Sequence, residues 1–350
     1  MESGGIVLAG GLLIGLVYGA VGLLSGFCLL SGLRGWNGDG DGRLIRAYAL
    51  ALGVAIAGTQ FLAASGFVEF SKTIYLQAAF SAPMIFLGGM LFGYGMVLAN
   101  GCGSRALVLL GRGNLRSFVV IVVLGIVAQM VLKGLIAPPR IVLTQATQTA
   151  VPAVSLPALL SASGLGEAFA RTLAATAVSV ALFIFAFAHT SFRQSRGQIA
   201  AGLAVGFLVV AGWLVTGYLG ADDFNPAPIT SLTFVAPAAD TVQYAMFSTG
   251  LSASFGVMLV AGVLAGSLVT ALVTGRFQLE GYKSPQHMLR SIGGAALMGA
   301  GGAMAYGCSV GQGLTGLSTL SLASFIAVAG ILIGSALGLR GALRVPALAS

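Results

Sequence analysis

The chain has 350 residues, of which 57% are hydrophobic and only 7% are charged, and its formal net charge is +8. A soluble domain carries about 25% charged residues, so this composition excludes a soluble globular protein and predicts an integral membrane protein. The positive balance does not indicate nucleic-acid binding, because the Lys and Arg residues gather in short loops between apolar spans.

Nine apolar segments are long enough to be membrane spans of roughly 20 residues each. They cover about 5–30, 44–64, 81–100, 117–136, 167–188, 198–219, 253–274, 291–306 and 322–340. The longest loop, 137–166, is nearly uncharged after Arg140, and we expect it to lie at the outer membrane surface. A second loop, 220–250, holds Asp222 and Asp223. We therefore predict an all-α membrane protein with about nine transmembrane helices.

The distribution of charge predicts how the chain is oriented in the membrane. If the N-terminus lies outside, thirteen of the 17 Lys and Arg residues fall on the inner side. The four that fall outside are Lys72, Lys133, Arg140 and Arg171. Because positive residues concentrate on the cytoplasmic side, we predict an outer N-terminus and a cytoplasmic C-terminus.

One glycine-rich stretch with a cysteine occurs twice. Asn100-Gly101-Cys102-Gly103-Ser104-Arg105 follows an apolar run, and Tyr306-Gly307-Cys308-Ser309 follows a similar one. A shift of 206 positions superposes Cys102 on Cys308. The same shift superposes four glycines that precede Cys102 on glycines that precede Cys308. The superposed pairs are Gly88 and Gly294, Gly93 and Gly299, Gly95 and Gly301, and Gly101 and Gly307.

This recurrence, with the predicted orientation, indicates two units that are inverted relative to each other in the membrane. We expect a first unit at 1–140, an outer loop and connecting helix at 141–197, and a second unit at 198–350. At the start of the units, Gly15 and Gly19 match Gly202 and Gly206 with a shift of 187. Residues 26–28, Gly-Phe-Cys, have a looser counterpart in Gly-Trp-Leu at 212–214, so Cys28 has no cysteine partner.

Each repeated cysteine is expected to stand at a helix break. We predict short helices over 103–111 and 309–317, whose N-termini would present unpaired N–H groups beside Cys102 and Cys308. Such helix starts favour anions, and in inverted repeats they face each other near the membrane midplane. The alternative is that these glycines only permit tight helix packing.

The thiols are better suited to binding than to catalysis. A catalytic thiolate needs a neighbouring base or cation, but His189 and His287 fall in inner loops. A zinc site needs companion ligands near the cysteines, and the sequence offers none nearby. Neutral thiols are weak donors with polarizable sulfur, which suits a sulfur-bearing anion. We expect no catalytic residue, no metal and no cofactor.

The residues expected to bind substrate surround the three cysteines. Arg105 either lies on the inner side of the site or serves only as a positive-inside anchor, and the sequence leaves both readings open. Gln312 is a candidate for lining the path, whereas Gln60 and Gln129 are expected to form interhelical hydrogen bonds. The complete set is Cys28, Cys102, Cys308, Gly101, Gly103, Ser104, Arg105, Gly307, Ser309 and Gln312.

Together these blocks resemble a known family. The chain resembles the YeeE/YedE family of sulfur-compound transporters in three cysteine-containing blocks: Gly-Phe-Cys at 26–28, the block at 100–105, and Tyr-Gly-Cys-Ser-Val-Gly-Gln-Gly at 306–313. The segment Ser-Leu-Thr-Phe-Val-Ala-Pro at 231–237 also resembles that family. The resemblance implies an hourglass-like inverted repeat with short re-entrant helices. It also implies an inner-membrane permease for thiosulfate, in which the thiols of Cys28, Cys102 and Cys308 form S–H···S hydrogen bonds to the substrate sulfur.

The same resemblance implies a small cytoplasmic sulfur-carrier protein of the TusA-like type as a partner, and other sulfur or selenium compounds as alternative substrates. Two other functions stay open. A membrane-embedded sulfurtransferase would form a cysteine persulfide, although the sequence lacks an obvious activating base. A structural membrane protein would use the cysteines for packing.

Overall fold

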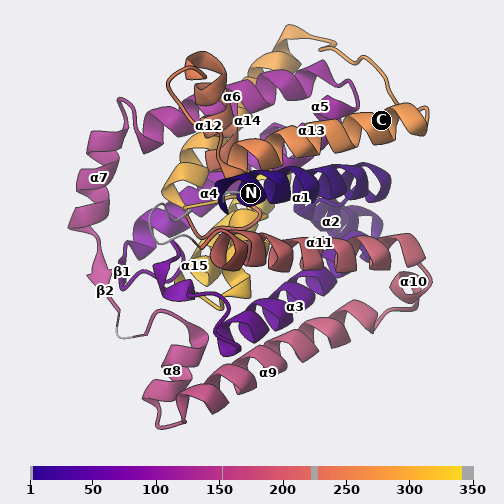
Figure 1. The fold of residues 1–350 in the computed structure, drawn as a ribbon. Helices are drawn as coiled ribbons and strands as arrows, with labels where there is room; N and C mark the ends of the chain where they lie inside the picture. The colour runs from indigo at the N-terminus through magenta and orange to yellow at the C-terminus, as the bar shows by residue number, and fades with distance from the viewer. Residues whose placement is uncertain (1–2, 152, 222–227, 341–350) are drawn as a thin grey trace.

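The computed structural model describes residues 3–151, 153–221 and 228–340, and nearly all of its regular structure is helical (Figure 1). The elements of the first half are α1 (Ser3–Ser25), α2 (Leu29–Arg34), η1 (Gly35–Asp39), α3 (Arg43–Ala64), η2 (Phe70–Lys72), β1 (Ala79–Phe80), α4 (Ala82–Leu98), α5 (Gly103–Gly111), α6 (Leu115–Leu132), α7 (Ala137–Ala146), β2 (Thr149–Ala150) and α8 (Leu156–Ala162).

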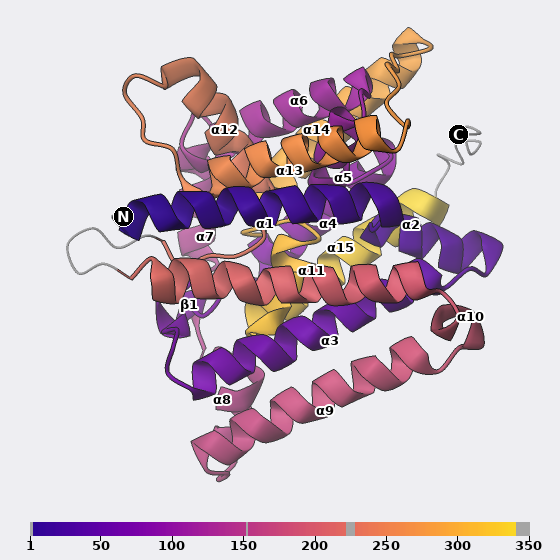
Figure 2. The same ribbon diagram turned by 45° about the vertical axis from the view of Figure 1, so that its right-hand side comes forward.

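The elements of the second half are α9 (Glu167–Phe187), α10 (Thr190–Arg193), α11 (Arg196–Leu214), η3 (Val215–Leu219), α12 (Val235–Phe247), α13 (Phe255–Val273), α14 (Pro285–Met304), η4 (Gly311–Gly316) and α15 (Leu322–Arg340). The long helices α1, α3, α9, α11 and α13 run across the view in Figure 2 from one end of the molecule to the other.

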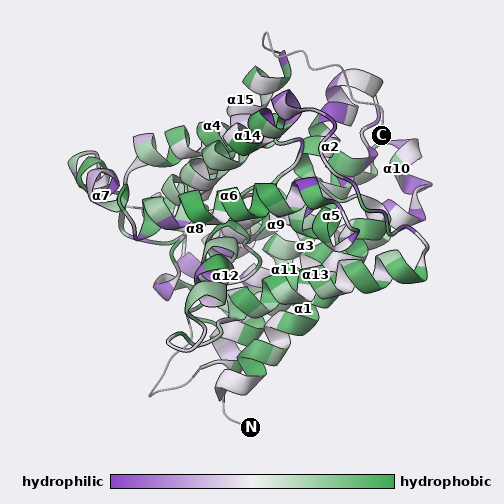
Figure 3. Cartoon of the chain, turned by 90° about the horizontal axis from the view of Figure 1, so that it is seen from above, coloured by the Kyte–Doolittle hydropathy of each residue, from purple (hydrophilic) through white to green (hydrophobic). Residues whose placement is uncertain are grey.

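Eight helical segments in the described part of the chain are long and apolar enough to cross a membrane, which confirms an all-α integral membrane protein. They are 4–38, 43–64, 82–111, 115–132, 167–187, 196–219, 255–273 and 322–340. The remaining predicted span, 291–306, lies mostly in α14, a helix of 20 residues that begins with polar side chains. Hydrophobic residues colour most of the long helices in Figure 3, and side chains such as Phe61, Ile184 and Val273 are largely exposed, as lipid-facing residues are.

The first predicted span, 5–30, is broken rather than continuous. Helix α1 ends at Ser25, Gly26 takes a left-handed φ of 70°, and α2 begins only at Leu29. The Ser25 hydroxyl donates to Val21 O (2.6 Å) and accepts from Phe27 N (3.2 Å), so it supplies partners where the helix stops. Only glycine adopts this conformation without steric cost, which explains why the break falls at Gly26.

The two long predicted loops contain helices. Residues 137–166 form α7, β2 and α8, and Ser155 caps α8 by accepting from Ala158 N at 3.4 Å. Strand β2 pairs with β1 in an antiparallel ribbon, with Ala79 opposite Ala150. The second loop, 220–250, contains α12, whereas Asp222 and Asp223 lie outside the described residues. A Pro at the start of α7 and α8 is compatible with a first helical turn, where no N–H partner is needed.

Glycines allow the long helices to pack with their backbones in direct contact. Helix α1 packs on α13, where Gly15 and Gly19 face Gly262 and the backbone around it. Helix α4 packs on α15 in the same way, through Gly89 and Gly93. Since lipid offers no hydrophobic force to join helices, close van der Waals packing between small residues is the main attraction.

The contact between α4 and α14 is reciprocal. A Cβ on Gly88 would lie 2.8 Å from Gly301 O, and a Cβ on Gly95 would lie 2.6 Å from Gly294 O. The shift of 206 carries Gly88 to Gly294 and Gly95 to Gly301, so it converts the first contact into the second. The two helices that precede the repeated cysteines therefore cross each other through equivalent residues.

Replacing Gly95 by Ala tests this close packing. The added methyl group would overlap the carbonyl oxygen of Gly294, and overpacking of this kind costs about 1–3 kcal/mol. We expect Gly95→Ala to lower the thermal unfolding midpoint in detergent. The matched control is Gly293→Ala, because a Cβ at this exposed position of α14 meets nothing within 4 Å. Equal midpoints for the two variants would contradict the packing described.

Candidate functional site

Cys102 stands at the start of a short helix, as predicted. Helix α5 covers Gly103–Gly111, the predicted range, and Cys102 is its N-cap residue with extended backbone angles. The Cys102 Sγ lies 3.2 Å from the hydroxyl of Ser104, and Cys102 is only 1% exposed. The thiol is thus buried beside the first turn of a helix, where backbone N–H groups have no partner within the helix.

The helix after Cys308 differs from the prediction. An α-helix was expected over 309–317, but the structure has a π-helix over Gly311–Gly316. Its wider turn includes a hydrogen bond from Thr315 N to Val310 O (3.0 Å), five residues back. Gly311 N donates to Cys308 Sγ at 3.2 Å. A Cβ on Gly313 would clash with the hydroxyl of Tyr48, so the glycine allows α3 to approach this turn.

The backbone before each of these two cysteines has the same conformation. Asn100 and Tyr306, which the shift of 206 superposes, have left-handed φ angles of 61° and 56°. Gly101 N bonds Met96 O (3.0 Å), and Gly307 N bonds Gly302 O (2.9 Å). A hydrogen bond from an N–H to the carbonyl five residues earlier, with a left-handed residue just before the donor, is the Schellman motif that ends a helix. Both long helices, α4 and α14, therefore end in the same way just before a cysteine.

Cys28 has a counterpart that the sequence comparison missed. It is the N-cap of α2, and the residue 206 positions later, Phe234, is the N-cap of α12. The expected counterpart at 212–214 is wrong, since Trp213 lies inside α11 and donates from Nε1 to Ser318 Oγ at 3.2 Å. The same shift that relates the two paired cysteines therefore relates Cys28 to an aromatic residue.

The structure brings the three cysteines together around Tyr18. The side chains of Cys28 and Ser309 are neighbours of the Cys102 thiol. Tyr18 lies near Ser104 and the three cysteines, and its ring centroid lies 5.1 Å from that of Phe234. All three thiols are free and at most 5% exposed, so in this conformation they are closed off from both sides of the molecule.

Two tyrosines and Phe234 are the site residues that sequence reasoning missed. Tyr48, on α3, donates its hydroxyl to the carbonyl oxygen of Ser309, and its ring stacks on Phe27 with the centroids 5.7 Å apart. Tyr18 and Tyr48 lie inside apolar spans, where a phenol gives no motif by itself. Phe234 could have been found, since extending the shift of 206 back to Cys28 points directly to it.

The remaining predicted residues surround the turns that carry the thiols. Gln312 is 1% exposed and donates from Nε2 to Ala305 O at 2.6 Å, so it braces the turn before Cys308. Gln60 and Gln129 form the expected interhelical bonds, to Ser318 O at 3.0 Å and to Gln243 Oε1 at 2.5 Å. A Cβ at Gly101, Gly103 or Gly307 would meet side chains or the following turn at 3.2–3.4 Å.

A cavity of about 80 Å³ lies beneath the Asn100–Arg105 turn. Arg105 lines it and donates from Nη1 to Gly22 O at 3.3 Å. His287 also lines it, and the expectation of a loop histidine is wrong because His287 lies in the first turn of α14. Burial, together with the charges of Arg116 and Arg290, holds the pKa of His287 below its usual range.

Comparison with known proteins gives consistent results. The sequence matches a family described as sulphur transport over residues 24–337. It is 24% identical to the thiosulfate transporter TsuA of Escherichia coli (strain K12) over 351 residues, covering 94% of this chain and 92% of the relative. It is also 24% identical to the thiosulfate transporter TsuA of Spirochaeta thermophila over 333 residues, covering 93% of this chain and 96% of that relative.

Replacing Tyr48 by Phe tests how the Cys308 turn is held. The change would leave the buried carbonyl of Ser309 without this donor, a loss of about 1–3 kcal/mol. We expect a lower thermal unfolding midpoint in detergent. Tyr218→Phe is the control, since Tyr218 is 50% exposed. An unchanged midpoint for Tyr48→Phe would show that the hydroxyl does not support the turn.

Proposed function

This chain belongs to the sulphur transport family, and we propose that it is a permease that takes up thiosulfate along a narrow path between its three cysteines. The proposal is supported most directly by the convergence of Cys28, Cys102 and Cys308 at the starts of short helices around one point. It is also supported by the names of two relatives of nearly equal length.

The chemistry of these thiols suits passage rather than tight binding. A neutral S–H group is a weak donor with a polarizable sulfur, and it would form an S–H···S contact with the terminal sulfur of thiosulfate. The first turn of α5 offers N–H groups to the negative charge. Conduction needs sites that bind an anion strongly enough to admit it and weakly enough to release it. Because the thiols are buried in this conformation, passage also needs a small opening of the turns beside them.

The residues proposed to contact the substrate are those of the two matched turns and Cys28. Ser104 and Ser309 add hydroxyl groups beside Cys102. Glycines 101, 103 and 307 keep the turns free of side chains, Gln312 holds the second turn, and Arg105 receives the anion on the inner side.

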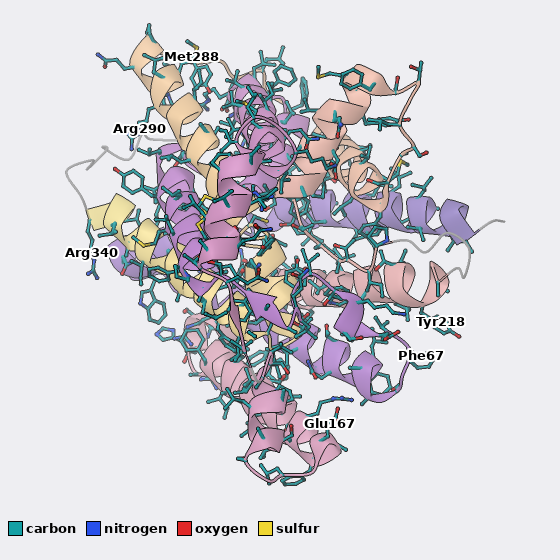
Figure 4. The ribbon with its side chains drawn as sticks, turned by 90° about the vertical axis from the view of Figure 1, so that its left-hand side faces the viewer. Phe67, Glu167, Tyr218, Met288, Arg290 and Arg340 are labelled. Atoms are coloured by element: carbon teal, nitrogen blue, oxygen red, sulfur yellow. The ribbon has the colours of Figure 1, made fainter. Side chains whose placement is uncertain are left out.

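We propose the inner membrane as the location, with the N-terminus outside and the C-terminus in the cytoplasm. In Figure 4, Arg290 and Arg340, both predicted to be inside, lie at one end of the molecule, and Glu167, predicted to be outside, lies toward the other. Arg344 is outside the described residues. The division into units at 1–140, 141–197 and 198–350 is part of this proposal, supported by the reciprocal contact of α4 with α14.

A TusA-like sulfur-carrier protein in the cytoplasm is the partner proposed to receive the sulfur, as the resemblance to the family implies. Other sulfur or selenium compounds are alternative substrates, since a thiol would contact any terminal chalcogen atom in a similar way.

A second candidate function is sulfur transfer, which the contact between Cys28 and Cys102 favours. A thiolate would attack the outer sulfur of thiosulfate, form a cysteine persulfide and release sulfite. Intact-mass measurement after exposure to thiosulfate separates the two functions. We expect an unmodified mass, whereas one added sulfur atom on a cysteine would favour transfer.

Alanine substitutions at the cysteines test the permease directly. In a sulfur-auxotrophic host grown on thiosulfate, we expect Cys102→Ala and Cys308→Ala to abolish growth, because the contacts to the terminal sulfur are lost. Serine keeps a donor but lacks the polarizable sulfur, so Cys102→Ser should give partial growth at best. Expression must be matched by the amount of folded protein in the membrane. Normal growth of both alanine variants would rule out a role for these thiols in transport.

A further inference from the structure

The cavity beneath the Asn100–Arg105 turn has a polar, basic lining that the thiol path does not explain. Four elements meet there: the α4–α5 turn, α5, and the starts of α6 and α14. Its roof includes Asn100 and Gly101, so it lies directly next to Cys102 in the chain. The lining residues with polar side chains are Asn100, Arg105, Asn114, Arg116, Ser117, His287 and Ser291.

The charge balance around the cavity is positive. No Asp or Glu lines it within the described part of the chain. The carboxylate of Glu280 accepts from two lining residues, Arg116 (2.5 Å) and Asn114 (2.8 Å), and from Arg112 (3.5 Å). Two arginines thus share one carboxylate, and a net positive charge remains on that side of the cavity.

Arg105 has spare capacity for an anion. Its described hydrogen bond goes to a backbone carbonyl, Gly22 O, at 3.3 Å, and it has no ion pair with a described residue. A guanidinium carries five N–H donors, so most of those on Arg105 are available. Above it, Arg34 donates to Asn100, and this holds the roof of the cavity in place.

The lowered pKa of His287 is a second sign that the cavity has positively charged surroundings. Burial and the charges of Arg116 and Arg290 hold its pKa below its usual range, so the surroundings of the ring disfavour a further positive charge. The Nε of Arg290 is itself buried without a hydrogen-bond partner among the described residues. Arg290 thus adds positive charge close to His287, which lines the cavity.

We propose that this cavity is a second anion site, which binds the oxygen atoms of a small divalent oxyanion through Arg105, Arg116 and Ser291 after the anion leaves the thiols. This inference rests on the proposed transport function and adds a release station to it. The thiols would recognise the terminal sulfur, whereas arginine and hydroxyl groups recognise charged oxygen atoms. A volume of about 80 Å³ is several times what one water needs, so a small oxyanion fits.

The site should therefore accept sulfate, which lacks the terminal sulfur that the thiols would bind. Sulfate binding to the purified protein in detergent, followed by isothermal titration calorimetry, is the test. We expect binding to the wild type and to Cys102→Ala, and at least a tenfold weaker affinity in Arg105→Gln, since a charge-assisted hydrogen bond is lost. Arg105→Lys should lie between the two, because it keeps the charge but loses the planar fork of donors.

Two controls keep the test decisive. Arg43→Gln removes an arginine that is paired with Asp41 (2.7 Å) and does not line the cavity, so it should bind sulfate like the wild type. If Arg105→Gln does not fold, Ser291→Ala replaces it and should weaken binding severalfold, because it removes a hydroxyl donor from the site. Because the readout is sulfate binding, Cys102→Ala can lose thiosulfate uptake and still bind sulfate. The two proposals therefore fail separately.

Three results would overturn the proposal. The first is no sulfate binding to the wild type, and the second is equal affinity in the wild type and Arg105→Gln. The third concerns lipid, because a phosphate headgroup has the same chemistry as a free oxyanion. Sulfate binding in nanodiscs of phosphatidylcholine that disappears in nanodiscs of phosphatidylglycerol would assign the cavity to a headgroup instead.

Discussion

The structure depends on one constraint: a helix can stop inside a membrane only where the protein itself satisfies the backbone groups that the stop exposes. Here α4 and α14 both stop before a cysteine, and each does so through a left-handed residue, Asn100 or Tyr306, followed by a bond from Gly101 or Gly307 back to the helix. The first N–H groups of α5 have no partner within the helix after the first stop, whereas after the second stop Gly311 N donates to Cys308 Sγ. The proposed anion site would follow from this way of ending the two helices.

Glycine also allows the helices that precede the two cysteines to pack closely. The two helices that precede the repeated cysteines cross through backbone contacts, with Gly88 against Gly301 and Gly95 against Gly294. The three thiols are buried, and the polar cavity borders the turn that carries Cys102. Selection by sulfur at the thiols and by charged oxygen at Arg105 would then occur at two successive points along one path.

Much of this was predictable from sequence, and the reasons for success and failure are physical. The range of α5 followed from glycines at both of its ends, and the repeat followed from matched glycine and cysteine spacing. Helix α12 was missed because Val235–Phe247 is too short for a span and lies in a segment with several prolines. The turn after Cys308 is contacted by Tyr48, which donates to Ser309, 261 residues later, and lies close to Gly313, and such long-range contacts leave no local pattern in the sequence. The break at Gly26 was hidden because its flanks are apolar, and hydropathy does not detect a change of φ at one residue.

The central claim is that the path selects thiosulfate by its terminal sulfur. The most direct measurement compares the uptake of labelled thiosulfate and labelled sulfate into proteoliposomes that contain the purified wild-type chain, with empty liposomes as the baseline. We expect thiosulfate to enter well above the baseline, and sulfate to enter no faster than into empty liposomes although it binds at the inner cavity. Thiosulfate uptake at the baseline, or sulfate uptake at the same rate as thiosulfate, would contradict the central claim.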